Sequence, residues 1–193
     1  MATQNERRTT TRASIVDAAR FFFGTAGFEA TKIDDIAAKA GVAKGAVYHH
    51  FKNKNEVFAA VFERVSEALV ADMLSELHPG KSTAGRLMKF VKHFFDLCAE
   101  PQTSRIFLQD GPAVLGYDEW RRLDTRHFGG LVTSALGEAM KAGAIKKQPL
   151  ESLSRIMLGG IQAAAIDCTV QDDFDRAAKS YLIVFKEILD GLK

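Results

Sequence analysis

Apolar residues recur at steps of three and four along nearly the whole chain, and this spacing places side chains on one face of an α-helix. No long run alternates apolar and polar residues at the two-residue period of a strand. Only 4 of the 193 residues are proline, so few positions interrupt a helix. Because 47% of the residues are hydrophobic, the chain also has enough apolar material to build cores. The sequence therefore predicts an all-α protein.

The first fifty residues predict three helices separated by short turns. Helical spacing favours a helix over residues 8–26, a second helix with Ile33, Ile36, Ala37 and Ala40 on one face, and a third over residues 44–50. Gly27 and Gly41 mark the ends of the first two. The order Thr31-Lys32-Ile33-Asp34 matches a capping box at the start of the second helix. A helix, a tight turn containing glycine and a second helix, supported by a preceding helix, is the arrangement of a helix-turn-helix unit.

The remaining chain predicts longer helices. Asn53 is expected to cap a fourth helix that ends at His78-Pro79-Gly80. Prolines and glycines then divide the chain into helices near residues 82–100, 102–110, 117–142, 150–170 and 174–191. We expect two domains, with residues 1–53 forming the helix-turn-helix unit and residues 54–193 forming a helical domain whose residues 54–78 are a linking helix.

Basic residues gather in the predicted helix-turn-helix unit. Residues 1–56 contain nine lysines and arginines against six acids, and four lysines but no acid lie between Asp35 and Glu56. A local basic surface on an otherwise balanced chain suits a polyanionic partner such as DNA, although an ordinary solvated face has the same pattern.

The adjacent histidines His49 and His50 suggest a metal site or a general base as an alternative. Neighbouring side chains on a helix point about 100° apart, so these two cannot both face one ion. No Cys, Asp or Glu lies between positions 36 and 55 to complete such a site. We therefore predict no cofactor, no metal and no catalytic residue, and we expect Cys98 and Cys168 to be buried free thiols. A helical enzyme that uses these histidines or Cys98 remains the rival interpretation.

Eight elements in this region resemble the signature of the TetR family of bacterial transcriptional regulators over residues 10–58. They are Thr31, Ile36-Ala37, Ala40-Gly41-Val42, Gly45, Tyr48, His50-Phe51, Lys54 and Glu56. The resemblance implies a nine-helix dimer with a DNA-binding head, a linking fourth helix and a C-terminal domain that dimerises and usually holds a small-molecule pocket. It also implies repression at a palindromic operator, relieved when ligand binding moves the heads apart.

Matching positions to the family pattern assigns roles to individual residues. By this resemblance Thr31, Tyr48, His50 and Lys54 would contact phosphates of double-stranded DNA, whereas Lys44, Ala46 and His49 would face the major groove. Gly45 has no side chain to hold the backbone away from DNA. Ala43 stands where the family often has Ser or Thr, so no contact is assigned to it.

The C-terminal half has more aromatic residues than simple packing needs and no strong charge cluster. We therefore expect a small effector that is largely apolar or aromatic. The candidate effector-binding residues are Phe90, Phe94, Phe107, Tyr117, Trp120, His127, Met157 and Ile161. A lone histidine such as His127 also fits an ordinary core position. Control by a protein partner, without a small-molecule effector, is the alternative function.

The last two predicted helices, about residues 150–191, combine small residues such as Gly159 and Gly160 with a wide apolar face that includes Phe185 and Ile188. We expect a homodimer through these helices, because a helix-turn-helix unit needs a partner to contact two half-sites. Intramolecular packing alone is the alternative. The polar start of the chain and the lack of an apolar stretch of about 20 residues predict a cytoplasmic protein without membrane contact.

Overall fold

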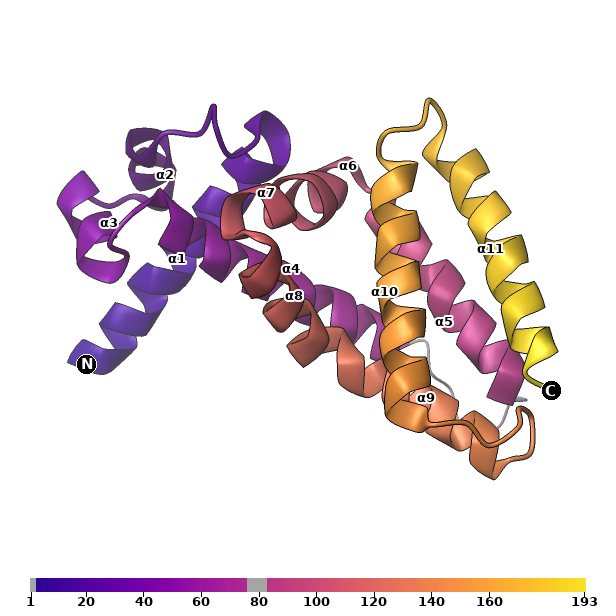
Figure 1. Cartoon of the computed structure of the whole chain (residues 1–193). Helices are drawn as coiled ribbons and strands as arrows, with labels where there is room; N and C mark the ends of the chain where they lie inside the picture. The colour runs from indigo at the N-terminus through magenta and orange to yellow at the C-terminus, as the bar shows by residue number, and fades with distance from the viewer. Residues whose placement is uncertain (1–2, 76–82) are drawn as a thin grey trace. The chain divides into compact units, whose positions relative to one another are not determined.

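The computed structural model describes residues 3–75 and 83–193, and these ranges are helical apart from short connections (Figure 1). The prediction of an all-α protein is confirmed. When directly adjoining segments are joined, the described ranges contain nine continuous helices, as expected. Within the same ranges, no helix combines the length and the apolar composition that a membrane crossing requires.

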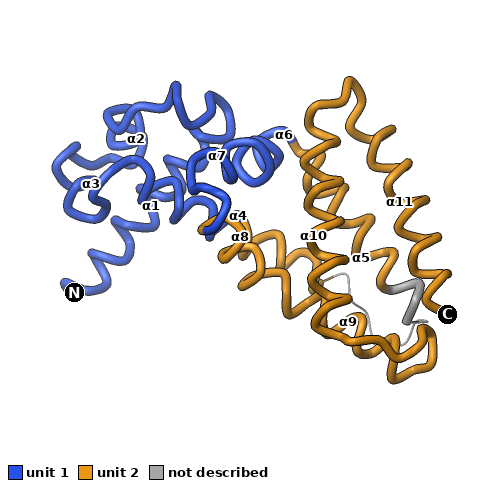
Figure 2. The backbone as a smooth tube through the Cα atoms, in the orientation of Figure 1, with its two compact units in different colours: residues 1–65, 101–118 blue, residues 66–100, 119–193 orange. Residues whose placement is uncertain are grey.

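The chain packs into two compact units, which Figure 2 colours separately. Unit 1 comprises residues 1–65 and 101–118, and unit 2 comprises residues 66–100 and 119–193. The segment 101–118 therefore packs with the N-terminal helices, although it lies far from them in sequence. This division follows packing, and the functional boundary expected after residue 53 stays a prediction.

Unit 1 is built from the three N-terminal helices, the first part of a long fourth helix and a short helical segment from the middle of the chain. Its elements are α1 (Gln4–Ala26), α2 (Ile33–Ala40), α3 (Lys44–His50), the start of α4 (Lys54–Ser75), α6 (Pro101–Thr103), the π-helical segment η1 (Ser104–Asp110), α7 (Gly111–Leu115) and the start of α8 (Tyr117–Asp124). All seven residues of η1 lie within the predicted 102–110 helix, and α7 follows η1 directly.

Aromatic rings fill the core of unit 1. Phe23, Phe28 and Phe58 form a cluster with ring centroids 5.2 to 5.7 Å apart. Phe62 of α4 stacks on Phe107 of η1, with centroids 5.1 Å apart and an interplanar angle of 12°. Gly111 allows this approach, because a Cβ atom at that position would lie 2.8 Å from the Phe62 ring. Ring stacking thus holds the segment 101–118 to α4.

Helix caps in unit 1 confirm one expectation and correct another. The Asn53 side chain accepts a hydrogen bond from the Glu56 amide at 2.9 Å, so the expected cap of α4 is confirmed. The capping box at Thr31 is wrong: α2 begins after Lys32 and has no side-chain cap. Thr31 lies one residue before the N-cap position, which Lys32 occupies, and its buried hydroxyl instead donates to the Gly27 carbonyl oxygen at 2.7 Å. The predicted end of the fourth helix at residues 78–80 lies outside the described residues.

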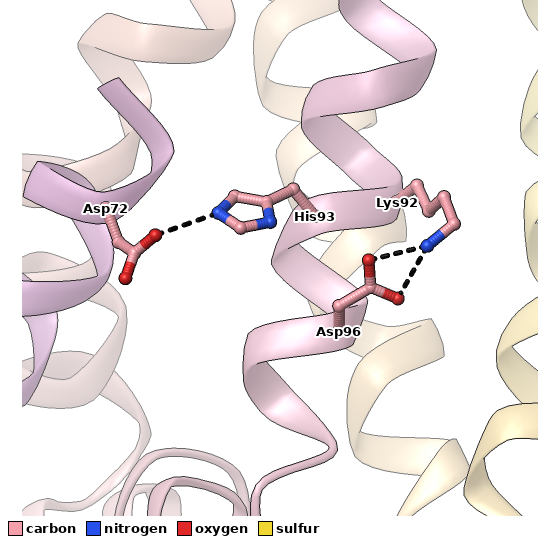
Figure 3. A network of polar contacts seen from close by, with 4 residues as sticks. All are labelled: Asp72, Lys92, His93 and Asp96. Atoms are coloured by element: carbon pink, nitrogen blue, oxygen red, sulfur yellow. Dashed lines mark hydrogen bonds and ion pairs between the residues drawn. The ribbon is translucent and has the colours of Figure 1, made fainter. Parts of the chain in front are cut away.

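Unit 2 is a bundle of longer helices. It comprises the end of α4, α5 (Thr83–Cys98), the end of α8, the π-helical segment η2 (Thr125–Gly129), α9 (Gly130–Lys141), α10 (Leu150–Cys168) and α11 (Phe174–Gly191). Figure 1 shows α10 and α11 lying side by side. Nε2 of His93 lies 3.0 Å from Oδ1 of Asp72 and ties α5 to α4 (Figure 3). Lys92 and Asp96, both exposed, pair within α5 on the side away from Asp72 (Figure 3).

Candidate functional site

The turn between α2 and α3 fixes the helix-turn-helix geometry. Gly41 adopts the left-handed conformation, with φ of 69°. Its amide donates to the Ala38 carbonyl at 3.2 Å, and the next amide, of Val42, donates to the Ala37 carbonyl at 3.0 Å. This is the double hydrogen bond of a Schellman motif, which favours glycine because of the positive φ. The tight turn predicted from Gly41 therefore forms by a defined backbone mechanism.

The helix α3 is anchored by two apolar residues and presents the candidate contact residues to solvent. Val47 is fully buried and Phe51, which follows the helix, is nearly so. Lys44, Gly45, Tyr48 and His49 are exposed, whereas Ala46 and His50 are half-buried. The structure thus gathers all six candidates of α3 on one short helix. A Cβ atom built on Gly45 would meet nothing within 4 Å, so packing inside the protein does not require glycine there.

The surroundings of Lys44 and His50 shift the pKa values of both side chains. Nζ of Lys44 lies 3.0 Å from Oδ2 of Asp34 on α2, and this hydrogen bond raises the pKa of the lysine. The pKa of His50 is lowered, first by burial and then by repulsion from His49, Arg8 and Arg12. The two imidazole rings meet edge to face, with centroids 5.5 Å apart. His50 therefore favours its neutral form until a negative group approaches.

Two other candidates are engaged in the fold itself. Lys54 donates hydrogen bonds from Nζ to three backbone carbonyls of the turn between α1 and α2, those of Phe28 at 2.8 Å, Glu29 at 3.3 Å and Thr31 at 3.2 Å. Thr31 is only 2% exposed. The phosphate contacts expected of Lys54 and Thr31 stay predictions, and both side chains also stabilise this turn.

The end of α1 and the turn that follows it are held by two residues of η1 that the sequence did not suggest. Nη1 of Arg105 donates to the Thr25 carbonyl at 2.7 Å. Oδ2 of Asp110 accepts a hydrogen bond from the Phe28 amide at 2.8 Å. These contacts join residues about 80 positions apart, and no local pattern indicates them. Side chains from α4 and η1 thus fix the corner that precedes α2.

Unit 2 contains a narrow apolar cavity. Its free space is about 290 Å³ including the mouth, and its interior is little wider than a water molecule. The lining residues come from α4, α5, α8, η2, α9 and α10: Met73, Phe90, Val91, Phe94, Asp124, Phe128, Val132, Leu158, Ile161 and Gln162. An aromatic ligand would have to displace some of these side chains to enter.

Two polar side chains interrupt the apolar lining. Asp124 is 1% exposed and Gln162 is 7% exposed. Oδ2 of Asp124 and Nε2 of Gln162 are buried and have no hydrogen-bond partner among the described residues. Burial raises the pKa of Asp124 to about 7, so its carboxyl is roughly half protonated at neutral pH. Buried polar atoms without a hydrogen-bond partner are rare in folded proteins and call for an explanation.

The eight candidate effector residues do not form one group. Phe90, Phe94 and Ile161 line the cavity. Trp120 and Met157 are buried elsewhere in unit 2, and His127 is half-buried on η2. Phe107 packs in the core of unit 1, and Tyr117, also in unit 1, is 63% exposed.

Asp124 and Gln162 were not among the predicted effector residues, although their spacing in the sequence indicates a buried position. Asp124 follows Trp120 by four positions and Gln162 follows Leu158 by four, so both polar residues share a helix face with buried apolar ones. A polar residue in that register is a candidate for a buried polar contact.

Two features of the described residues bear on the enzyme alternative. These residues contain no group of three or more His, Cys, Asp or Glu side chains that could hold a metal ion. Cys98 and Cys168 are buried free thiols, as predicted. Burial raises the pKa of Cys98 far above its ordinary value and that of Cys168 to about 11. Both thiols therefore stay protonated and are poor nucleophiles.

Comparisons with known proteins agree with this geometry. Residues 15–61 match the family model "Bacterial regulatory proteins, tetR family", and residues 84–192 match "Tetracyclin repressor-like, C-terminal domain". The transposon Tn10 TetC protein of Escherichia coli is 25% identical over 192 residues, which cover 98% of this chain and 96% of TetC.

Two solved structures show the same fold at lower identity. A TetR-family transcriptional regulator from Pectobacterium atrosepticum superposes with a TM-score of 0.86 at 24% identity, covering 99% of this chain and 97% of the other. RolR in complex with resorcinol gives a TM-score of 0.75 at 20% identity, covering 94% and 90%. The C-terminal model alone spans more than half of the chain. This protein therefore belongs to the TetR family of helix-turn-helix transcriptional regulators, which are DNA-binding proteins and not enzymes.

Proposed function

We propose that this regulator represses transcription by binding a palindromic operator as a homodimer, and that a small, largely apolar effector releases it. The observation that carries the effector part is the apolar cavity of unit 2, which is enclosed by residues of six helical segments. Control by a protein partner is the alternative that the sequence left open, and the cavity favours the small molecule.

The DNA-binding part of the proposal rests on the exposed side chains of α3. Lys44, Ala46 and His49 are proposed to contact base edges in the major groove, where a lysine can donate to guanine and a methyl group can meet thymine. Tyr48 and His50 are proposed to contact phosphates, which fix the register of the helix without reading sequence. Two heads in a dimer would then contact half-sites about 34 Å apart.

The dimer part rests on apolar side chains that α10 and α11 leave exposed. Ile156 of α10 is 71% exposed, and beside it on the same helix face Gly159 and Ala163 leave room for a close neighbour. On α11, Val184 and Ile188 are 54% and 45% exposed, whereas Phe185 and Leu189 face the core. A second copy of the chain that packs α10 and α11 against the same helices would bury these side chains as a four-helix interface.

A route from ligand to DNA follows from the order of the chain. The segment 101–118 is continuous with α5 on one side and with α8 on the other, and both helices contribute cavity residues, Phe94 and Asp124 among them. The same segment holds the end of α1 through Arg105 and the α1–α2 turn through Asp110. A ligand that shifts the ends of α5 or α8 would therefore bias the position of the DNA-binding helices.

The operator is tested by footprinting the purified protein on the DNA upstream of its own gene. We expect a two-fold symmetric footprint with half-sites about one helical turn apart, which small apolar compounds abolish. A footprint that no such compound changes, but that a protein fraction abolishes, would favour control by a partner instead.

The dimer is tested by sedimentation of charge variants. Ile156→Glu and Val184→Glu should convert the dimer to monomer and abolish operator binding. Val170→Glu is the matched control, since Val170 is 77% exposed in the turn outside α10 and α11. Dimers of unchanged affinity in both test variants would place the interface elsewhere.

A further inference from the structure

We infer that the effector bound in the unit 2 cavity carries a hydroxyl group on an apolar frame, and that Asp124 and Gln162 recognise this hydroxyl together. The inference rests on the proposed function of the cavity as the effector site and narrows the chemical class of the effector. The observation behind it is the pair of buried polar atoms, Oδ2 of Asp124 and Nε2 of Gln162, that lack a partner among the described residues and line one apolar cavity.

A buried polar atom without a hydrogen bond is costly, so a ligand that supplies the missing partner gains affinity from it. The other eight lining residues are apolar and offer no partner to either side chain. The two atoms also fail to bond each other. Asp124 ends α8 where the π-helical segment η2 begins, and Gln162 projects from α10, so both are fixed by helices. Such a cavity selects ligands whose hydrogen-bond donors and acceptors match its own unpaired polar groups.

The chemistry of the two side chains separates the ligand classes. The amide nitrogen of Gln162 is a donor and needs an acceptor. A carboxylate at Asp124 needs a donor, whereas a protonated carboxyl also donates. An ammonium group would satisfy the ionised carboxylate but offers nothing to Gln162. A carboxylate ligand would repel an ionised Asp124. A hydroxyl both donates and accepts, so it serves Gln162 and either protonation state of Asp124, and it fits either orientation of the amide.

The protonation of Asp124 supports this choice. Its pKa of about 7 results from burial alone, without a contribution from a neighbouring cation. Among the described residues, no cation contributes to holding this carboxyl ionised for a cationic ligand. The surrounding rings of Phe90, Phe94 and Phe128 provide an apolar frame that matches an aromatic or aliphatic body.

Four probes of similar size test the inference on the full chain: phenol, toluene, benzylamine and benzoate. Isothermal titration calorimetry at pH 7 measures the dissociation constant of each. Phenol should bind at least about tenfold more tightly than toluene, because only phenol satisfies both buried groups. The two ions should bind more weakly than phenol. Release of operator DNA is followed in parallel by fluorescence anisotropy.

Variants connect the preference to the two side chains. In the double variant Asp124→Leu with Gln162→Met, toluene should bind as tightly as phenol or more tightly, because no unsatisfied polar group remains. Gln162→Met alone should reduce the preference for phenol and provides the test if the double variant does not fold. Asp124→Asn keeps a donor and an acceptor and should retain the preference. Asp172→Asn, on the exposed turn before α11, is the matched control and should behave as the wild type.

The outcomes separate this inference from the proposed function. Equal binding of toluene and phenol to the wild type, or a preference for benzylamine or benzoate, would overturn the hydroxyl assignment and leave the cavity as an effector site. Persistence of the phenol preference in the double variant would also overturn it. If none of the four probes binds while operator binding is intact, the cavity is not the effector site and the inference fails with it.

Discussion

The ammonium group of Lys54 donates a hydrogen bond to the carbonyl oxygen of Phe28 at 2.8 Å and also lies 4.2 Å from the centroid of that residue's ring. Two more carbonyls of the same turn, those of Glu29 and Thr31, accept from Nζ. One side chain at the start of α4 thus closes the turn that leads into α2. A residue that the family pattern assigns to DNA is also part of the scaffold that orients the DNA-binding helices.

Lys54→Ala should therefore reduce stability as well as DNA binding. Loss of three charge-assisted hydrogen bonds from a half-buried lysine should lower the free energy of unfolding by about 1–2 kcal/mol. Operator affinity should fall on all sequences, and the slope of log affinity against log salt should decrease by about one. Urea denaturation and anisotropy titrations at several salt concentrations measure the two effects.

Lys52→Ala is the control for Lys54→Ala. The Lys52 side chain is 88% exposed, and its ammonium lies 3.8 Å from Oε1 of Glu56. Its removal should leave stability unchanged. Equal stability of the Lys54 and Lys52 variants would mean that the carbonyl contacts contribute nothing to the fold.

The ion pair between Lys44 and Asp34 predicts a substitution that strengthens operator binding. Asp34 lies 3.0 Å from the ammonium of Lys44 and competes with DNA for it. Asp34→Asn should therefore tighten operator binding, whereas Lys44→Ala should weaken it and change the preferred base at one position of each half-site by about 1–3 kcal/mol. Binding to a set of operators with single base changes measures this. Asp17→Asn, which breaks the exposed pair with Arg64, is the control, and a uniform loss for Lys44→Ala on every operator would remove Lys44 from base recognition.

Substitution of Gly45 should change stability and operator affinity in opposite directions. A methyl group at this position meets no atom within 4 Å, and alanine favours a helix over glycine by about 0.5–1 kcal/mol. Gly45→Ala should therefore raise the melting temperature slightly. It should weaken operator binding by at least about tenfold, or 1.4 kcal/mol, because the methyl group holds the backbone away from DNA. A variant with unchanged affinity would show that α3 does not approach DNA at this residue.

Local signals in the sequence were enough for the helices and the turn. The run from Ile33 to Val42 combines helical spacing with a glycine at the position of positive φ, and both act within one turn of the chain. The hydroxyl of Thr31 was misassigned because whether it caps α2 or bonds Gly27 depends on burial by other helices. Similarly, Phe107 and Trp120 look alike as aromatic residues on helices, yet one packs in unit 1 and the other in unit 2.

Long-range contacts could not be predicted from local spacing. The bonds from Arg105 to the end of α1 and from Asp110 to the α1–α2 turn join segments whose proximity depends on the packing of unit 1. An amphipathic pattern normally assigns polar residues such as Asp124 and Gln162 to the solvent face. Only their spacing of four residues from Trp120 and Leu158 places them on a buried face. The sequence predicted an aromatic pocket from composition, but composition does not locate the buried polar atoms of Asp124 and Gln162.

Operator binding should depend on pH through His50. Its pKa is below the ordinary 6.5 in the free protein because of burial and the neighbouring His49, Arg8 and Arg12. A phosphate beside the ring would raise this pKa in the complex, so binding takes up a proton. Affinity should therefore increase as pH falls from 8 to 6, by less than about tenfold per pH unit for one proton. Anisotropy titrations with His50→Gln should show a flatter pH profile. His49→Gln is measured alongside, and an unchanged profile for His50→Gln would exclude a phosphate at His50.

Asp124 should make the protein less stable as pH rises through the acid range. Its pKa is 3.8 when unfolded and about 7 when folded, so between these values the unfolded chain loses a proton that the folded chain keeps. Below pH 4 both states are protonated and the group costs nothing. Between pH 4 and 7 stability falls, and above pH 7 the loss is complete, at roughly 4 kcal/mol or less.

Asp124→Asn removes this titration while preserving the shape of the side chain. The variant should differ least from the wild type in urea denaturation at the lowest pH, below 4, and exceed it increasingly up to pH 8, whereas the exposed Asp172→Asn should follow the wild type throughout. A constant difference between Asp124→Asn and the wild type at every pH would mean that the carboxyl titrates normally in the folded protein. In that case the cavity would already hold an ionised group, and an ammonium ligand would suit it better than a hydroxyl.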